Sequence, residues 1–321
     1  MVKMSNRTIA KFACVVILLA GSGAFATACS QATPDKRYSV NSSALSSDYD
    51  KPVIVGRIGS DEITESSGIA ASQCQPGVFW THNDSGDDAY IFAINLKGDH
   101  LGTWLVSGAR NRDWEDIAAY KDSSGTCYLY IGDIGNNKGE RSEQRVYRVK
   151  EPSASTDSKT MSKKNPGQTE PSEALVFKYP ETLYDAETLM AHPQSGDIYV
   201  LTKRIDGPAI VFKIKPLFGG SAAVTAERIA EVSLPAVPNG LLTGGAISQD
   251  AKHVVVCDYS AAYVLDLGTA ANFDDIWKQA PVTVDLGDRR QGEAVTFSPD
   301  GRSIIATSEK KNSPIIEAKR K

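Results

Sequence analysis

The fold is decided by the stretch Asn111-Arg112-Asp113-Trp114-Glu115-Asp116-Ile117-Ala118, in which an acidic residue stands just before a short apolar strand. The pattern returns at Glu187-Thr188-Leu189-Met190 and at Glu293-Ala294-Val295-Thr296-Phe297. Two related stretches begin at Ser67 and Gly245, with Ser or Gly in place of Glu. A turn and a stronger β run follow each copy. Such repetition indicates an array of like structural units.

The spacing of the five copies predicts the architecture. From residue 67 to 115, 187, 245 and 293 the steps are 48, 72, 58 and 48 residues. A period of roughly 40–50 residues with several strands is typical of propeller blades, and helical periodicity is nearly absent after residue 50. The sequence therefore predicts an all-β fold, a five-bladed β-propeller. A six-bladed propeller, with two blades merged in the long step, and a β-sandwich are the alternatives.

The propeller is expected to occupy residues 51–321. Its last unit has only three strands, and an N-terminal strand at 52–58 can supply the fourth and close the ring, which removes exposed sheet edges. Residues 151–173, within the long step, are rich in Ser, Lys, Pro and Thr. Because such a segment buries little apolar area, we expect a disordered surface insertion there.

The N-terminus has the pattern of an export signal. A basic stretch precedes an apolar run at 12–20 that is too short to span a bilayer. The following Ala26-Thr27-Ala28-Cys29 resembles the lipobox of bacterial lipoproteins, although Leu is commoner at the first position. We therefore expect a signal peptide at 1–28, lipidation of Cys29, and a flexible tether at 29–50 to the outer face of the cell membrane. Free secretion is the alternative.

Composition and cysteine positions add two expectations. A net charge of −4 and a pI near 5.7 argue against a nucleic-acid-binding protein, which is usually basic; we expect a monomer that meets the membrane only through its anchor. Cys74 and Cys127 lie in equivalent turns of successive units, and an exported protein can be oxidised, so a Cys74–Cys127 disulfide is predicted. Cys257 lies in an apolar strand and is expected to be a buried thiol.

The repeated residues should converge, because the first strand of every propeller blade lines the central channel. Ser67, Glu115, Glu187 and Glu293 would then meet on the axis. Carboxylates so close together either take up protons at a raised pKa or hold a cation. Ca²⁺ accepts irregular sets of oxygen ligands, whereas zinc and copper favour thiol or imidazole ligands that this ring lacks. The alternative is that each Glu binds backbone amides and no metal is present.

Loops on the same face supply further candidates. Arg side chains suit phosphate or carboxylate groups, and a side chain beside a bound water can move its proton. The candidates for binding a small anionic ligand are Asn83, Asp84, Arg110, Arg112, Asn136, Asn137, Lys203, Arg204, Arg289 and Arg290. The candidates for handling a water proton are Asp113, Asp133 and His82.

The chain resembles a family of exported bacterial β-propeller proteins whose role is unclear. The resemblance spans roughly residues 60–318 and is carried by Trp80-Thr81-His82-Asn83-Asp84-Ser85-Gly86, Asp113-Trp114-Glu115-Asp116, Tyr130-Ile131-Gly132-Asp133-Ile134-Gly135-Asn136-Asn137, Asp185-Ala186-Glu187 and Gln291-Gly292-Glu293-Ala294.

A more distant resemblance concerns function. The order Ser67, Glu115, Glu187, a small residue and Glu293 is similar to that of the calcium-activated nucleotidase (apyrase) family. Those proteins are five-bladed propellers with an axial Ca²⁺, and they hydrolyse nucleoside di- and triphosphates. The resemblance implies that these four residues are Ca²⁺ ligands. Gly245 departs from it, because the family has Ser there; Thr243 or a backbone carbonyl is the substitute that the sequence offers.

Two functions stay open. The favoured one is a non-enzymatic binding or scaffold propeller at the cell surface, whose partner is a small anionic ligand or a cell-surface protein. The alternative is a Ca²⁺-dependent phosphohydrolase. Propellers host many functions, and no single residue is a convincing general base, which favours the binding role.

Overall fold

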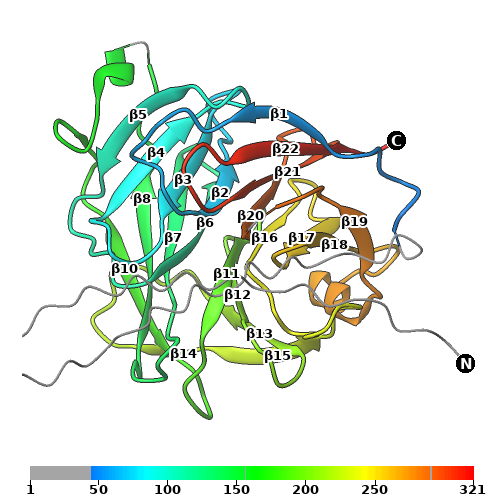
Figure 1. Ribbon diagram of the computed structural model, residues 1–321. Helices are drawn as coiled ribbons and strands as arrows, with labels where there is room; N and C mark the ends of the chain where they lie inside the picture. Colours follow the sequence, from blue (N-terminus) through cyan, green and yellow to red (C-terminus); the bar gives the residue numbers. More distant parts are fainter. Residues whose placement is uncertain (1–44, 156, 290) are drawn as a thin grey trace, which may run out of the picture. The chain divides into compact units, whose positions relative to one another are not determined.

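The computed structural model describes residues 45–155, 157–289 and 291–321. It confirms the five-bladed β-propeller: five sheets are arranged so that their innermost strands contact one another in a closed ring (Figure 1). The innermost strands are β2 (Ser66–Ala71), β6 (Trp114–Lys121), β11 (Ala186–Ala191), β16 (Gly244–Ile247) and β20 (Gly292–Phe297).

The first three blades are antiparallel sheets, two of them extended by a short parallel strand. Blade 1 continues from β2 with β3 (Phe79–Asn83), β4 (Tyr90–Ile94), β5 (His100–Leu105) and the short β9 (Gly167–Gln168). Blade 2 continues from β6 with β7 (Cys127–Asp133), β8 (Gln144–Lys150), β10 (Glu173–Lys178) and the short β14 (Val224–Thr225). Blade 3 continues from β11 with β12 (Ile198–Thr202), β13 (Ala209–Ile214) and β15 (Glu227–Val232).

The last two blades show how the ring closes. Blade 4 contains β16, β17 (His253–Cys257), β18 (Ala261–Asp266) and β19 (Val282–Asp285). Blade 5 contains β20, β21 (Ser303–Ser308), β22 (Pro314–Lys319) and, as its outer strand, β1 (Val53–Arg57). The antiparallel pairing of β1 with β22 confirms the predicted closure by an N-terminal strand. Among the described residues, the short 3₁₀ helices η2 (Asp157–Thr160) and η3 (Phe273–Lys278) lie between strands.

The core lies between neighbouring blades, and β17 shows why its sequence is apolar without interruption. Val254 and Val256 pack into one apolar cluster, shared with blade 3, whereas Val255 and Cys257 pack into another, shared with blade 5. Successive side chains of a strand point to opposite faces, so a strand between two blades must be apolar on both. Cys257 is a buried free thiol, as predicted.

Blades 1 and 2 are also joined covalently. The predicted disulfide between Cys74 and Cys127 is present, with the two Cα atoms 6.2 Å apart. It links the turn after β2 to the start of β7, the equivalent hairpin positions of adjacent blades.

The sequence predicted a disordered insertion at 151–173, but the described residues of this segment pack on blade 1. Its β9 pairs with β5, and η2 contacts the same strand (green, beside β5 in Figure 1). The Ser158 hydroxyl is buried and donates to the carbonyls of Leu101 and Ser155. Ala154 and Met161 also pack against the apolar core that contains Trp104, so polar and apolar contacts together hold the insertion on the propeller.

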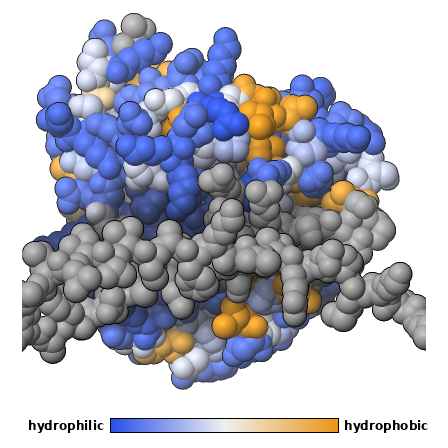
Figure 2. All heavy atoms as spheres, in the orientation of Figure 1, coloured by the Kyte–Doolittle hydropathy of each residue, from blue (hydrophilic) through white to orange (hydrophobic). Residues whose placement is uncertain are grey.

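Part of the expected tether belongs to the propeller as well. Leu45 and Tyr49 form bridges with Thr283 and Arg320, so contacts with blades 4 and 5 begin before residue 51. The predicted signal peptide and Cys29 lie outside the described residues. Within the described part, no helix is long and apolar enough to cross a membrane. Hydrophilic residues dominate the face in Figure 2, and apolar ones form small separate groups.

Candidate cation and anion site at one mouth of the channel

Four of the five innermost strands carry a β-bulge at the repeated residue. In β6 the pairing with β7 passes from Trp114 directly to Asp116, so Glu115 is the extra residue. The same shift falls at Ser67, Glu187 and Glu293. A bulge leaves its residue out of the ladder and redirects the side chain. All four residues are buried at the same end of the channel, where the innermost strands begin.

Blade 4 has no such bulge at the repeated residue, Gly245. It pairs in register with Val256. A Cβ on Gly245 would lie 2.9 Å from both the Thr188 methyl and the Val255 carbonyl oxygen, so a side chain does not fit. Thr243, the suggested substitute ligand, donates its hydroxyl to the Gly292 carbonyl at 2.9 Å. Its hydroxyl therefore bonds to the neighbouring blade.

The Ser67 hydroxyl, like that of Thr243, bonds to the backbone of the neighbouring blade. It donates to the carbonyl of Glu115 at 2.9 Å and so links blades 1 and 2.

Glu115 is the centre of the strongest candidate for a cation site. Carboxylate oxygens of Asp84, Asp113 and Glu115 all lie within 4.8 Å of one another. Glu115 is 3% exposed, and its carboxylate has no hydrogen bond or ion pair among the described residues. Burial raises the pKa of Glu115 well above its usual range, and the neighbouring Glu187, Asp84 and Asp113 charges add to this. Burial also raises the pKa of Asp84 to about 6.

The other two ring carboxylates have different surroundings. Glu187 forms an ion pair with Lys203, whose ammonium lies over the Tyr259 ring. Burial raises the pKa of Glu187 to about 7 although Lys203 opposes the shift. Burial and the Glu187 charge raise the pKa of Glu293, which also shares a hydrogen bond with Glu309. The predicted ring thus gathers at one mouth, but of its members only Glu115 joins a group that could hold one ion in the described structure.

Asp116, the neighbour of Glu115, is a structural residue that the sequence analysis missed. One carboxylate oxygen accepts from its own strand, at the Ile117 amide (2.8 Å). The other accepts from the amides of Leu189 in blade 3 (3.0 Å) and Gly245 in blade 4 (3.3 Å). Burial raises the pKa of Asp116 well above its usual range. This side chain therefore joins three blades and is not available to a ligand.

A surface pocket opens beside the cation candidate. Asp113 belongs to both, and the pocket is lined further by Ser85, Arg112, Asn136, Asn137, Lys138, Glu140 and Arg141. Arg112 and Lys138 are exposed, and neither forms an ion pair in the described part of the chain. Lys138 was absent from the sequence candidates, although it directly follows Asn137 in the same loop. The pocket can therefore present two positive charges to an anion.

Most of the other predicted ligand residues have internal partners. Asn83 and Asn136 bind loop backbone through their side-chain amides. Arg289 is buried and donates to the carbonyls of Asp258 and Thr307. Arg204 is paired with Asp206. Arg110 is exposed, and Arg290 lies outside the described residues.

Of the three candidates for moving a proton, only Asp113 lines the pocket. His82 is fully buried, packs edge-on against Trp114, and has its pKa lowered to about 4 by burial. Asp133 is buried in an ion pair with Arg141 (3.0 Å) and accepts from the Asp113 amide at 3.1 Å. Asp133 thereby supports the loop that carries Asp113.

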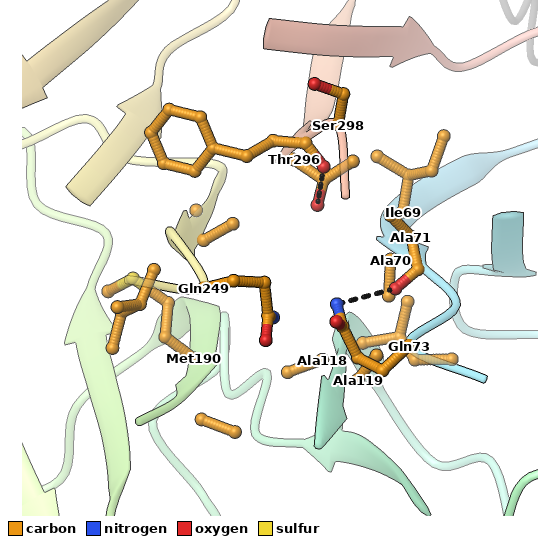
Figure 3. Close-up of a pocket in the computed structure, with 16 residues that line it drawn as sticks. Ile69, Ala70, Ala71, Gln73, Ala118, Ala119, Met190, Gln249, Thr296 and Ser298 are labelled. Carbon is orange, nitrogen blue, oxygen red and sulfur yellow. Dashed lines mark hydrogen bonds between the residues drawn. The ribbon is translucent and has the colours of Figure 1, made fainter. Parts of the chain in front are cut away.

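The opposite end of the channel has a different character. The pocket there is lined by small or apolar residues at the ends of the innermost strands, with Gln73, Gln249, Thr296 and Ser298 as polar members (Figure 3). Gln73 donates to the Ala71 carbonyl. No charged side chain lines this pocket, in contrast to the mouth that holds Glu115.

These features define a β-propeller with an acidic group and a basic-rimmed pocket at one mouth of its channel. No protein-family model matches the chain, and no curated protein matches it. Among solved structures it is similar to a gluconolactonase from Xanthomonas campestris, with a TM-score of 0.45 and 14% identity over 89% of this chain and 100% of that chain. The assignment of the site therefore rests on its own geometry.

Proposed function

We propose that this protein is a binding propeller that holds a divalent cation, Ca²⁺ by its ligand chemistry, together with a small anionic ligand. The supporting observation is Glu115, a buried carboxylate without a partner among the described residues, within 4.8 Å of Asp84 and Asp113. A buried charge without a partner is costly unless it is neutralised. A hard cation with oxygen ligands supplies the compensation, and Ca²⁺ tolerates an irregular carboxylate set.

The anionic ligand would lie in the adjoining pocket. Asp113 borders that pocket, so a group bound there lies next to the cation. Arg112 and Lys138 would contact its phosphate or carboxylate, Arg112 by a bidentate fork. In this arrangement the cation offsets the carboxylates and the basic side chains attract the ligand.

The test is calorimetric titration with Ca²⁺, followed by inorganic phosphate and citrate as anion probes. We expect Ca²⁺ binding that is lost in Glu115→Gln, and anion binding that needs Ca²⁺ and weakens in Arg112→Ala. The exposed Arg110→Ala is the matched control. Absence of Ca²⁺ binding to the wild-type protein would overturn the proposal.

A phosphate-release assay on the same protein distinguishes binding from catalysis. Ca²⁺-dependent release of phosphate from nucleoside diphosphates, lost in Glu115→Gln together with Ca²⁺ binding and retained in Arg110→Ala, would establish the phosphohydrolase. We favour the binding role because His82 and Asp133 are both engaged in the protein interior.

The proposed location is the outer face of the cell membrane, through a lipid on Cys29. Replacement Cys29→Ser should move the protein from the membrane fraction to the soluble fraction. Unchanged membrane association of this variant would contradict the lipid anchor.

A further inference from the structure

The part of the insertion at residues 157–173 reaches from the outer edge of blade 1 toward the mouth that holds the candidate site; we call it the strap. Near its outer end, the Thr169 amide donates to the Leu105 carbonyl, and Ser172 bonds to the Ser107 carbonyl. In its middle, Lys163 contacts the loop at 83–88, which carries Asp84. The strap is therefore held on blade 1 independently of that loop.

Lys163 makes contacts with its backbone and with its side chain. Its amide donates to both carboxylate oxygens of Glu62 at 3.0 Å, and its carbonyl accepts from the Tyr90 hydroxyl at 3.3 Å. The ammonium forms an ion pair with Asp87 at 2.5 Å and lies over the Phe92 ring. The Lys163 and Asp87 side chains are only 27% and 18% exposed, so this pair is shielded from water more than a surface pair is.

From Asp87 the contacts continue to Asp84. The Asn83 amide nitrogen donates to Asp87 (2.6 Å) and to the Glu62 carbonyl (2.8 Å). The Asn83 side-chain oxygen accepts from the Glu65 amide (3.1 Å), and the Glu65 carbonyl accepts from the Asp84 amide (3.2 Å). Lys163, Glu62, Asp87 and Asn83 thus form a closed ring of contacts at the base of the loop. Residues that hold a metal ligand in place without contacting the metal orient that ligand, and their loss commonly lowers metal affinity.

We propose that Lys163 is a positioning residue for the cation site, through which the strap holds the loop at 83–88 and with it Asp84. This inference rests on the proposed function, in which Asp84 is a cation ligand. It gives the insertion a role in ligand binding, and it implies that cation affinity depends on a segment that contributes no ligand.

The experiment compares Lys163→Met with Lys164→Met, which removes an exposed neighbouring lysine that has no ion pair in the described structure. Ca²⁺ affinity is measured by calorimetry on the whole protein. We expect Lys163→Met to bind Ca²⁺ about tenfold more weakly, Lys164→Met to bind as the wild type does, and Lys163→Arg to recover most of the affinity because it restores the ion pair with Asp87. Equal affinities of Lys163→Met and Lys164→Met would overturn the inference.

A second readout does not depend on the cation. In EDTA, hydrogen exchange of the amides at 84–88 should be faster in Lys163→Met than in Lys164→Met, because the loop has lost its outer contact. If the wild-type protein binds no Ca²⁺ but this difference appears, the proposed function fails and the strap contact stands. If exchange is unchanged, the positioning role is wrong whatever the metal result.

Discussion

At the scale of single residues, Glu115 and Asp116 show how two adjacent carboxylates take different roles. The bulge directs Glu115 to the mouth of the channel, and the next residue of β6 points into the protein interior. Asp116 then has three backbone amide partners from three blades, whereas Glu115 has none among the described residues. One carboxylate is structural, and the other is available for a ligand.

This contrast gives a prediction for stability. Asp116→Ala leaves three buried amides without an acceptor, each worth about 1–3 kcal/mol, so we expect a loss of at least about 3 kcal/mol. Glu115→Gln removes no protein contact and should change stability by less than about 1 kcal/mol in EDTA. Urea unfolding of both variants measures the difference. Equal midpoints for Asp116→Ala and the wild-type protein would show that Asp116 does not hold the blades together.

The carboxyls at the mouth also predict an unusual pH dependence. Their pKa values are raised in the folded state, to about 6 for Asp84 and about 7 for Glu187. A carboxyl with a raised folded pKa contributes stability at low pH that is lost as the pH rises through that value. His82, with its lowered pKa, opposes this only below about pH 6.5. We therefore expect the metal-free protein to become less stable between pH 6 and pH 8.

Urea midpoints in EDTA at several pH values check this expectation. The slope should be smaller in Glu187→Gln, which cannot titrate at that position, and it should shrink when Ca²⁺ is present. A midpoint that rises from pH 6 to pH 8 in EDTA would contradict the raised pKa values.

At the scale of elements, β1 closes the ring from the other end of the described chain. It pairs with β22 along blade 5, and without it the outer edge of β22 would present unpaired backbone groups. A chain beginning at residue 58 should therefore melt at a lower temperature than one beginning at residue 45, and it should form aggregates. Light scattering and thermal melts of the two chains test this. Two monomeric chains with equal midpoints would mean that β1 is dispensable.

Elements also show the limits of prediction from sequence. The innermost strands were predictable because their apolar runs and turns repeat, and Cys74 and Cys127 because their hairpins are equivalent. The order of residues 157–173 was not predictable, since it comes from individual contacts, such as those of Lys163 with Glu62 and of Met161 with the core, which leave no periodic pattern. The strands β9 and β14, two residues each, are likewise defined only by their neighbours.

At the scale of the whole molecule, the ring places five strand starts at one mouth, and this much of the site follows from the repeat. The distribution of partners within the mouth does not. Lys203 pairs with Glu187, and Glu293 has a hydrogen bond with Glu309, so neither resembles Glu115 despite the identical pattern in the sequence. Asp84 and Asp113 come from loops whose course depends on packing. The candidate cation site therefore lies among Asp84, Asp113 and Glu115. Of the four ligands that the repeat predicts, it includes only Glu115.

The most direct test of a cation site at Glu115 is a thermal melt of the protein in EDTA and in excess Ca²⁺, for the wild type and for Glu115→Gln. A ligand that binds only the folded state stabilises it by about 2.7 kcal/mol at a hundred times its dissociation constant. We predict a midpoint several degrees higher with Ca²⁺ for the wild-type protein, and no shift for Glu115→Gln. A wild-type midpoint that is the same in EDTA and in Ca²⁺, or an equal rise in Glu115→Gln, would contradict the site proposed for this mouth of the propeller.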